Sequence, residues 1–357
     1  MTEAPPKRSR MRAAWPWAKF LVGLALAGVA LWAVAGRRGE LSGASAYLAH
    51  LDWPWMVLAM VAEAGSLLAF AIIQQRLLAA AAVPCRLGPM VAVTAAATAI
   101  ANSMPAGPVV SSVFAFRQYR RRGADDAVAA WTLVAVFVAA SVSLALVAAA
   151  GLAVAGAESK GLDLVWVTIG VLVTALAVGA LFLQRRAMTW VVEAALRACR
   201  RLLHWPDGDV GARVDLIVTK LTAVTLSGRQ AASVTGWAVA NWVLDCACLV
   251  LCFVAVGVGI PWKGLLLAYG AGQLAANLPI TPGGLGVVEG SLTIALVAYG
   301  GAEVSTVAAV LLYRIMSFWA ELPIGWATWG MLAWTGRRQV MARSLLAPRQ
   351  DVAEVVA

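Results

Sequence analysis

The stretch Asn277-Leu-Pro-Ile-Thr-Pro-Gly-Gly-Leu-Gly-Val-Val-Glu-Gly290 places two prolines and four glycines inside apolar sequence, together with one carboxylate. Proline removes a backbone donor, and glycine lowers helix propensity. In a membrane, the backbone groups that such a break frees must bond to protein or to water, because lipid offers them no partner. The stretch therefore predicts a broken membrane helix whose interruption forms a buried polar site.

The composition of the whole chain supports a membrane setting. Of its 357 residues, 62% are hydrophobic and 13% are charged, and the mean hydropathy is +0.81. Several apolar runs approach the length of about 20 residues that a helix needs to cross a bilayer. These features predict a polytopic helical membrane protein and argue against a soluble enzyme.

The net charge of +10 does not indicate a nucleic-acid partner, because lysine and arginine gather in segments that would lie on one side of a membrane. That distribution follows the positive-inside rule and predicts cytoplasmic N- and C-termini. The cysteines show no CxxC spacing, and the histidines have no partner at ligand spacing. We therefore predict no metal, no cofactor and no nucleic acid. The residues in question are Cys85, Cys199, Cys246, Cys248, Cys252, His50 and His204.

The expected fold is all-α, with about six full spans and two re-entrant helical hairpins in an inverted repeat. The predicted spans cover residues 20–35, 55–73, 127–149, 164–183, 234–256 and 304–334, the last of them kinked near Pro323. A single integral membrane domain is expected over residues 1–357. It comprises a cytoplasmic N-terminus (1–19), a first repeat (54–150), a cytoplasmic segment (184–232), a second repeat (234–334) and a cytoplasmic tail (335–357). The cytoplasmic segment fits amphipathic surface helices and a solvated connector equally well.

Two hairpins are predicted from breaks in apolar sequence. Residues 88–122 are interrupted at Asn102–Pro108 and carry basic residues on both flanks, so this hairpin should enter from the cytoplasm and return to it. The hairpin over residues 265–299 should enter from the outside. Ala101-Asn102 recurs as Ala276-Asn277, and three predicted spans separate the hairpins, so the copies should have opposite orientations. Inverted repeats with broken helices are typical of secondary transporters, which bind substrate near the midplane.

Acidic residues within predicted spans are further candidates. Glu63, Asp245 and Glu321 would be costly in hydrocarbon, so they should face the protein interior. For Glu63, a functional role and a packing role as a neutral, hydrogen-bonded acid both remain open.

The chemistry of the second break favours an anion. The amides of Gly283, Gly284 and Gly286 belong to the start of a half-helix, where free donors and the helix dipole attract negative charge. Glu289 would repel an anion unless it is paired, and Arg314 is the predicted partner. Alternatively, this ion pair only locks two helices, while the Gly286-x-x-x-Gly290 spacing allows close packing.

No catalytic residue is predicted. The residues predicted to contact or move a substrate are Asn277, Thr281, Pro282, Gly283, Gly284, Gly286, Glu289, Arg314, Glu63, Asp245, Glu321, Asn102 and Arg117.

Four motifs carry a family resemblance: Asn277-x-x-x-x-Pro-Gly-Gly-x-Gly-x-x-Glu-Gly290, Gly300-Gly301, Leu312-Tyr-Arg314 and Pro323-x-Gly325. With them, roughly residues 15 to 335 resemble the lysylphosphatidylglycerol synthase transmembrane-region family, which includes the membrane half of the bacterial multiple peptide resistance factor. The resemblance implies a flippase of the bacterial or archaeal cytoplasmic membrane that moves an anionic phospholipid or a polyprenyl-phosphate-linked lipid between leaflets.

The resemblance is weaker in the first repeat. Relatives commonly have a Pro-Gly-Gly with an acid there and an arginine a few residues on, whereas this chain has Pro105-Ala-Gly-Pro108 and Arg117. A working half-site at the first break is therefore in doubt. About twenty residues follow the last predicted span, so we expect no soluble aminoacyl-transfer domain. A membrane-embedded lipid-modifying transferase and a non-transporting assembly partner remain the alternatives, and a homo-oligomer or a membrane partner stays open.

Overall fold

A computed structural model describes residues 51–104, 107–156, 170, 173, 226–276 and 282–346. Helices dominate these residues, and none of them forms a strand. The described part of the chain thus has the all-α fold that the sequence predicts. Four predicted parts lie outside the described residues: the span 20–35, the span 164–183 apart from positions 170 and 173, most of the cytoplasmic segment, and residues 347–357 of the C-terminal tail.

Four helical runs are long and apolar enough to cross a membrane: Trp53–Ala80, Asp126–Val154, Gly228–Val256 and Glu303–Thr335. They are formed by α3 (Trp53–Ala80), α6 (Asp126–Gly156), α10 (Gly228–Val256) and the continuous run α13 (Glu303–Arg314), η2 (Ile315–Trp319) and α14 (Glu321–Leu346). Each coincides with a predicted span. The chain is a polytopic membrane protein.

The last of these runs switches from α-helix to a π-helical turn close to Pro323, where the sequence predicts a kink. Pro323 has no amide to offer the carbonyl of Trp319, and its ring crowds that carbonyl. The turn directly before it, η2, is a π-helix. A π-turn is a common cause of a helix kink and widens the helix by one residue.

Both predicted breaks are present. The first hairpin consists of α4 (Leu87–Ser103) and α5 (Gly107–Arg121), and the second of α11 (Trp262–Ala276), a short turn η1 (Pro282–Gly284) and α12 (Val287–Ala298). A Cβ atom at Gly107 would overlap the backbone carbonyl of Ala101, so the first turn requires glycine. Each hairpin helix is too short to cross about 30 Å of hydrocarbon unaided.

The element order repeats along the chain. The offset from the start of α3 to the start of α10 equals the offset from the start of α4 to the start of α11. Helices α6 and α13 begin at nearly the same offset. Each repeat is thus a long helix, a broken hairpin and a second long helix.

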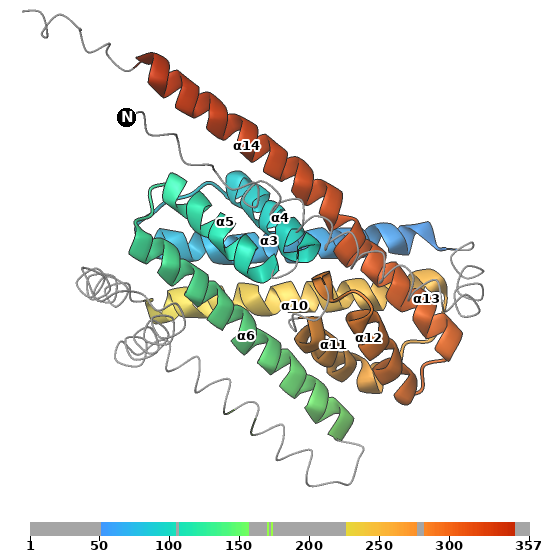
Figure 1. Ribbon diagram of the computed structural model, residues 1–357. Coiled ribbons are helices and arrows are strands. Elements are labelled where there is room, and N and C mark those ends of the chain that lie inside the picture. The colour runs from blue at the N-terminus through green and yellow to red at the C-terminus, as the bar shows by residue number, and fades with distance from the viewer. Residues whose placement is uncertain are drawn as a thin grey trace, which may run out of the picture.

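The central helices α3 and α10 show that the repeat is inverted. They are antiparallel, because the amide of Asp52 before α3 donates to the carbonyl of Ala255 at the end of α10 at 3.0 Å. Asn241 Nδ2 donates to Ser66 Oγ at 2.6 Å, and these two residues are separated by the same offset as the starts of the two helices. Equivalent positions therefore meet between the two helices, which lie side by side in Figure 1. This contact places a pseudo-two-fold axis between Ser66 and Asn241.

The two repeats are interlocked through their hairpins. Helix α4 packs against α14, and α11 packs against α6, so each hairpin lies on the last helix of the other repeat (Figure 1). Glycine permits both approaches: a Cβ at Gly325 would overlap the Ala95 carbonyl, and one at Gly151 would lie 2.7 Å from the amide nitrogen of Leu267. Close packing through small residues is the usual device for helices in lipid.

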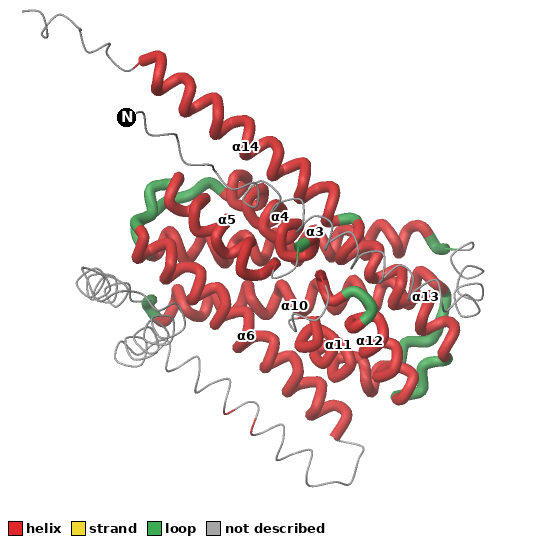
Figure 2. Tube along the Cα trace, in the orientation of Figure 1, coloured by secondary structure: helices red, strands yellow, loops and turns green. Residues whose placement is uncertain are grey.

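The hairpins leave opposite ends of the central pair, since α4 follows the end of α3 and α11 follows the end of α10. Figure 2 shows them on opposite sides of the central helices. Their breaks nevertheless meet: a Cβ at Gly283 would lie 3.0 Å from the carbonyl oxygen of Asn102. This meeting point is the place at which a functional site is expected.

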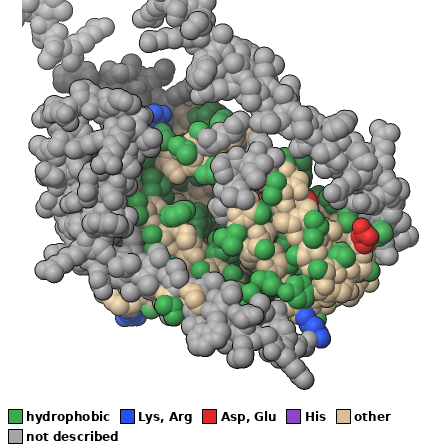
Figure 3. Space-filling view, turned by 60° about the horizontal axis from the view of Figure 1, so that its bottom comes forward, with side chains coloured by type: hydrophobic (Ala, Val, Ile, Leu, Met, Phe, Trp, Pro, Cys, Tyr) green, Lys and Arg blue, Asp and Glu red, His purple; other side chains and the backbone are tan. Residues whose placement is uncertain are grey.

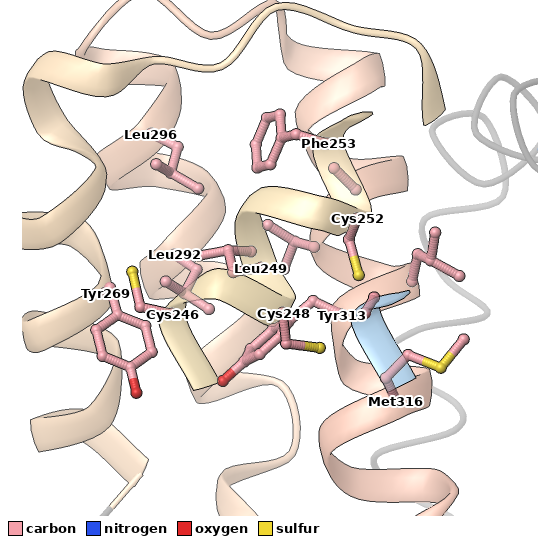
Figure 4. Packing of buried hydrophobic residues seen from close by; sticks show 14 of the residues in the cluster. Cys246, Cys248, Leu249, Cys252, Phe253, Tyr269, Leu292, Leu296, Tyr313 and Met316 are labelled. Carbon is pink, nitrogen blue, oxygen red and sulfur yellow. The ribbon is translucent and has the colours of Figure 1, made fainter. Parts of the chain in front are cut away.

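An apolar cluster around α10 supports the second hairpin (Figure 4). Its members include Cys246, Cys248 and Cys252, which are buried free thiols and pack as small hydrophobic residues. Among the described residues, no group of three or more His, Cys, Asp and Glu side chains could hold a metal ion. Figure 3 shows a face of the described chain on which hydrophobic side chains gather and the few visible charged ones lie near the margin. Such a face suits contact with lipid tails.

Candidate functional site

The second break is built from glycines in a backbone conformation that other residues rarely adopt. Gly283, Gly284 and Gly286 have φ values of 60°, 67° and 81°. Positive φ is open to glycine at little steric cost. A Cβ at Gly283 would also overlap the ring of Phe318, so the turn is closed tightly against η2.

Arg314 holds this turn in place. Its Nε lies 2.6 Å from Glu289 Oε1, and the two side chains are only 9% and 19% exposed. A terminal nitrogen of Arg314 donates to the carbonyl oxygen of Gly283 at 2.9 Å, and the guanidinium carbon lies 4.7 Å from the centre of the Phe318 ring. The ion pair predicted from the sequence is therefore present. It joins α12 and α13 and also satisfies a backbone carbonyl that the break leaves free.

Glu289 has a second contact that the sequence did not reveal. Its Oε2 accepts a hydrogen bond from the amide of Gly286 at 2.6 Å and thereby caps α12. One of the amides predicted to receive an anion is thus already bonded to a carboxylate. An anion that approaches this turn meets the Glu289–Arg314 pair and must compete with Glu289 for its donors.

The close-packing interpretation of Gly286 and Gly290 is wrong. A Cβ at either position would meet no atom of the described residues within 4 Å. Gly151 and Gly325 are among the glycines that do permit close helix contact, and those two lie where the repeats interlock.

A hydrogen-bonded network surrounds Asp245 in the centre of α10. Its Oδ2 accepts from the Tyr269 hydroxyl at 2.7 Å and from Gln273 Nε2 at 2.9 Å. Its Oδ1 accepts from the Tyr313 hydroxyl at 2.8 Å. In Figure 4 both tyrosine hydroxyls lie at the lower edge of the apolar cluster. Three donors from α11 and α13 thus converge on one buried carboxyl group.

Sequence reasoning assigned no role to Tyr269, Gln273 or Tyr313. A signal was available, because Tyr269 and Gln273 are polar residues four positions apart on a largely apolar helix and so share one face. Tyr313 stands next to Arg314 within a motif that carries the family resemblance. What the sequence could not provide was the distance from α11 to α10.

The other predicted acids lie beside Asp245. Glu63 on α3 is 8% exposed and interacts electrostatically with Asp245, and its buried Oε2 finds no donor among the described residues. Glu321, in the first turn of α14, interacts electrostatically with Asp245 and with Arg314. The structure therefore brings these three acids and Arg314 into one buried region.

The remaining predicted residues are less central. Asn102 lies near the second break, with its carbonyl oxygen close to Gly283. Arg117 is exposed on α5. Pro282 opens η1, whereas Asn277 and Thr281 fall outside the described residues.

The first repeat has a polar link of its own, but it is neutral. Gln74 Nε2 donates to Thr94 Oγ1 at 2.9 Å, and the Tyr119 hydroxyl donates to Gln74 Oε1 at 2.7 Å. Thr94 and Tyr269 occupy equivalent positions, because α4 and α11 begin at Leu87 and Trp262. Both side chains therefore connect a short hairpin helix to the central helix of its own repeat.

Comparison with known proteins gives two kinds of similarity. The model of a family described as the lysylphosphatidylglycerol synthase TM region matches residues 20–325. Two UPF0104 membrane proteins of Methanothermobacter thermautotrophicus are 44% and 29% identical to the chain, each over 85 residues, or 24% of this chain. These matches span 24% and 25% of the length of the curated relatives.

Proposed function

Since the chain belongs to the lysylphosphatidylglycerol synthase transmembrane-region family, we propose that it is a flippase that moves an anionic lipid between the leaflets of the membrane. The lipid would be a phospholipid or a polyprenyl-phosphate-linked lipid, because both carry a phosphate that suits an arginine beside a glycine turn. We also propose cytoplasmic termini and a bacterial or archaeal cytoplasmic membrane, in accord with the lysine and arginine distribution.

One observation carries the proposal. The breaks of two hairpins that leave opposite ends of the α3–α10 pair meet at Asn102 and Gly283, beside the buried Arg314–Glu289 pair. Irregular backbone at such depth is tolerated where it is enclosed by protein or lines a cavity. In inverted-repeat transporters, broken helices of this kind form the substrate site near the midplane.

The inverted repeat also supports a route for the lipid. Each hairpin packs on the last helix of the other repeat, so a movement of one hairpin against its neighbour would open the meeting point toward one side of the membrane. The equivalent movement of the other hairpin would open it toward the opposite side. The phosphate would contact Arg314 in both states, while the acyl chains stay in the bilayer.

A leaflet-exposure assay tests the proposal. Purified protein is reconstituted into vesicles with a fluorescent anionic phospholipid, and the fraction of label open to a membrane-impermeant quencher is followed over time. We expect wild-type protein to speed exchange, and Glu289→Gln and Arg314→Ala to reduce it to the rate of empty vesicles. Glu303→Gln, which alters an exposed acid at the start of α13, serves as the control and should retain exchange.

Exchange at the wild-type rate by both site variants would rule out this site. Wild-type protein that exchanges no lipid but converts a labelled lipid into a new product would instead identify a lipid-modifying transferase. We expect no such product from the wild-type protein.

A further inference from the structure

We propose that the Glu63–Asp245 carboxyl pair is a one-proton site, and that a proton bound there crosses the membrane together with the anionic head group. The second half of this inference rests on the proposed function, whereas the first half stands on the geometry alone.

The pair lies at the centre of the molecule. Glu63 belongs to α3 and Asp245 to α10, and these antiparallel helices cross close by, at Ser66 and Asn241. Both acids are 8% exposed. A proton held there is therefore shared between the two repeats.

Hydrogen-bond donors around the pair are distributed unequally. Asp245 accepts from Tyr269, Gln273 and Tyr313, so both of its oxygens act as acceptors. Glu63 has the opposite environment, since its buried Oε2 finds no donor among the described residues. An ionised Glu63 would hold a bare oxygen beside a second carboxylate, and both features are costly in a buried site. A protonated Glu63 can instead donate to Asp245, and both costs disappear.

The neighbouring groups do not replace this proton. On α10, Cys248 lies beside Glu63, and Glu321 of α14 adds a third acid to the region. Tyr313 already donates to Asp245, and Arg314 is committed to Glu289 and to the Gly283 carbonyl. A metal cation is a poorer occupant than a proton, because three donors fill the oxygens of Asp245 and no described group of acids could hold a metal ion.

Charge links this pair to the lipid site. Arg314 is the one basic side chain among the buried residues of the described chain, and it interacts electrostatically with both Asp245 and Glu321. A lipid phosphate that binds Arg314 would draw positive charge away from these acids. The proton held by the carboxyl pair offsets this loss, because its release would leave both acids charged. Anion and proton should therefore bind together and move in the same direction.

Infrared spectroscopy tests the proton site without any transport. In detergent at neutral pH, we expect wild-type protein to show the C=O stretching band of a buried protonated carboxylic acid, which shifts in deuterated water. The band should disappear in Glu63→Gln and persist in Glu303→Gln. An alkaline titration of the wild type should remove it in a single one-proton step, which supplies a test even where a variant fails to fold. A wild-type spectrum without the band, or a band that remains in Glu63→Gln, would overturn the proton site.

Lipid exchange under a pH gradient tests the coupling. With one anionic lipid carried per proton, a gradient of one pH unit should concentrate the labelled lipid up to about tenfold in the leaflet on the alkaline side. Glu303→Gln should respond in the same way, whereas Glu63→Gln should produce no asymmetry. A sodium gradient should have no effect, and an asymmetry driven by sodium would overturn the inference.

The outcomes of the two proposals are distinguishable. Rapid lipid exchange with no asymmetry under the pH gradient would refute the coupling and leave the flippase function intact. No lipid exchange by wild-type protein at all would refute the proposed function and the coupling together, while the infrared band still decides the proton site.

Discussion

The two hairpins share one geometry but differ in chemistry. In the first repeat, Gln74, Thr94 and Tyr119 form a neutral link between the hairpin and α3. In the second repeat, the residue equivalent to Thr94 is Tyr269, and it donates to a carboxyl group. The second hairpin alone also carries a described ion pair at its break.

This difference shows how an inverted repeat can become specialised. The symmetry is kept where it determines packing, at the Ser66–Asn241 crossing and at the interlocked hairpins. Among the described site residues, the second repeat contributes Arg314 and three of the acids, whereas the first contributes Glu63 alone. We therefore propose that the first hairpin is a scaffold for the site in the second hairpin, which gives the doubt about the first half-site a physical basis.

The largest effect should follow from removing the cation at the second break. Arg314→Gln leaves the half-buried Glu289 without its cation, and we expect it to lower the free energy of unfolding by about 3 kcal/mol. Arg117→Gln, an exposed arginine in the first hairpin, should change it by less than about 0.5 kcal/mol. Thermal unfolding of both variants in detergent measures the difference.

A double variant tests the pairing itself. Glu289→Gln with Arg314→Gln removes the unpaired charge and should recover part of the stability that Arg314→Gln loses. A double variant less stable than either single variant would contradict a buried ion pair.

The glycine turns should show an effect of intermediate size in both hairpins. Gly283→Ala places a Cβ at positive φ and against Phe318, so we expect a loss of about 1 to 3 kcal/mol in the free energy of unfolding. Gly107→Ala should be similarly destabilising, because its Cβ would overlap the Ala101 carbonyl. Gly290→Ala meets no neighbour and lies within α12, so it should be neutral or slightly stabilising. If all three variants have the same melting temperature, the two turns are not packed as tightly as the structure shows.

The smallest effect should come from the equivalent positions on α4 and α11. Tyr269→Phe removes a donor to Asp245 and should lower the free energy of unfolding by about 1 to 2 kcal/mol, against about 0.6 kcal/mol for Thr94→Val. In the vesicle assay only Tyr269→Phe should slow lipid exchange. If Thr94→Val slows it as strongly, the first hairpin is more than a scaffold.

Much of this architecture could be predicted from the sequence. Apolar runs and Pro-Gly breaks located the four described spans and both hairpins to within several residues, because in lipid these features directly limit what the backbone can do. The Glu289–Arg314 pair was also predictable, since a buried arginine requires a partner. The spacing at which Ala-Asn recurs in the sequence equals the spacing between the starts of α3 and α10.

The remainder depends on distances between helices. The sequence does not predict that Glu63 lies beside Asp245, because that contact depends on how α3 and α10 pack against each other. The bond from the Gly286 amide to Glu289 depends on the handedness of the glycine turn. The wrong prediction of close packing through Gly286 and Gly290 also concerned distances between helices. The spacing of two small residues does not show whether another helix lies against them.

The second hairpin, and not the first, is expected to hold an anionic lipid. Mass spectrometry of the lipid that copurifies with the protein tests this assignment, with Arg314→Gln and Arg117→Gln as a matched pair of arginine substitutions. We predict that wild-type protein and Arg117→Gln retain the same phosphate-bearing anionic lipid and that Arg314→Gln, in a folded preparation, loses it. Retention of that lipid by Arg314→Gln, or its loss from Arg117→Gln alone, would contradict the assignment.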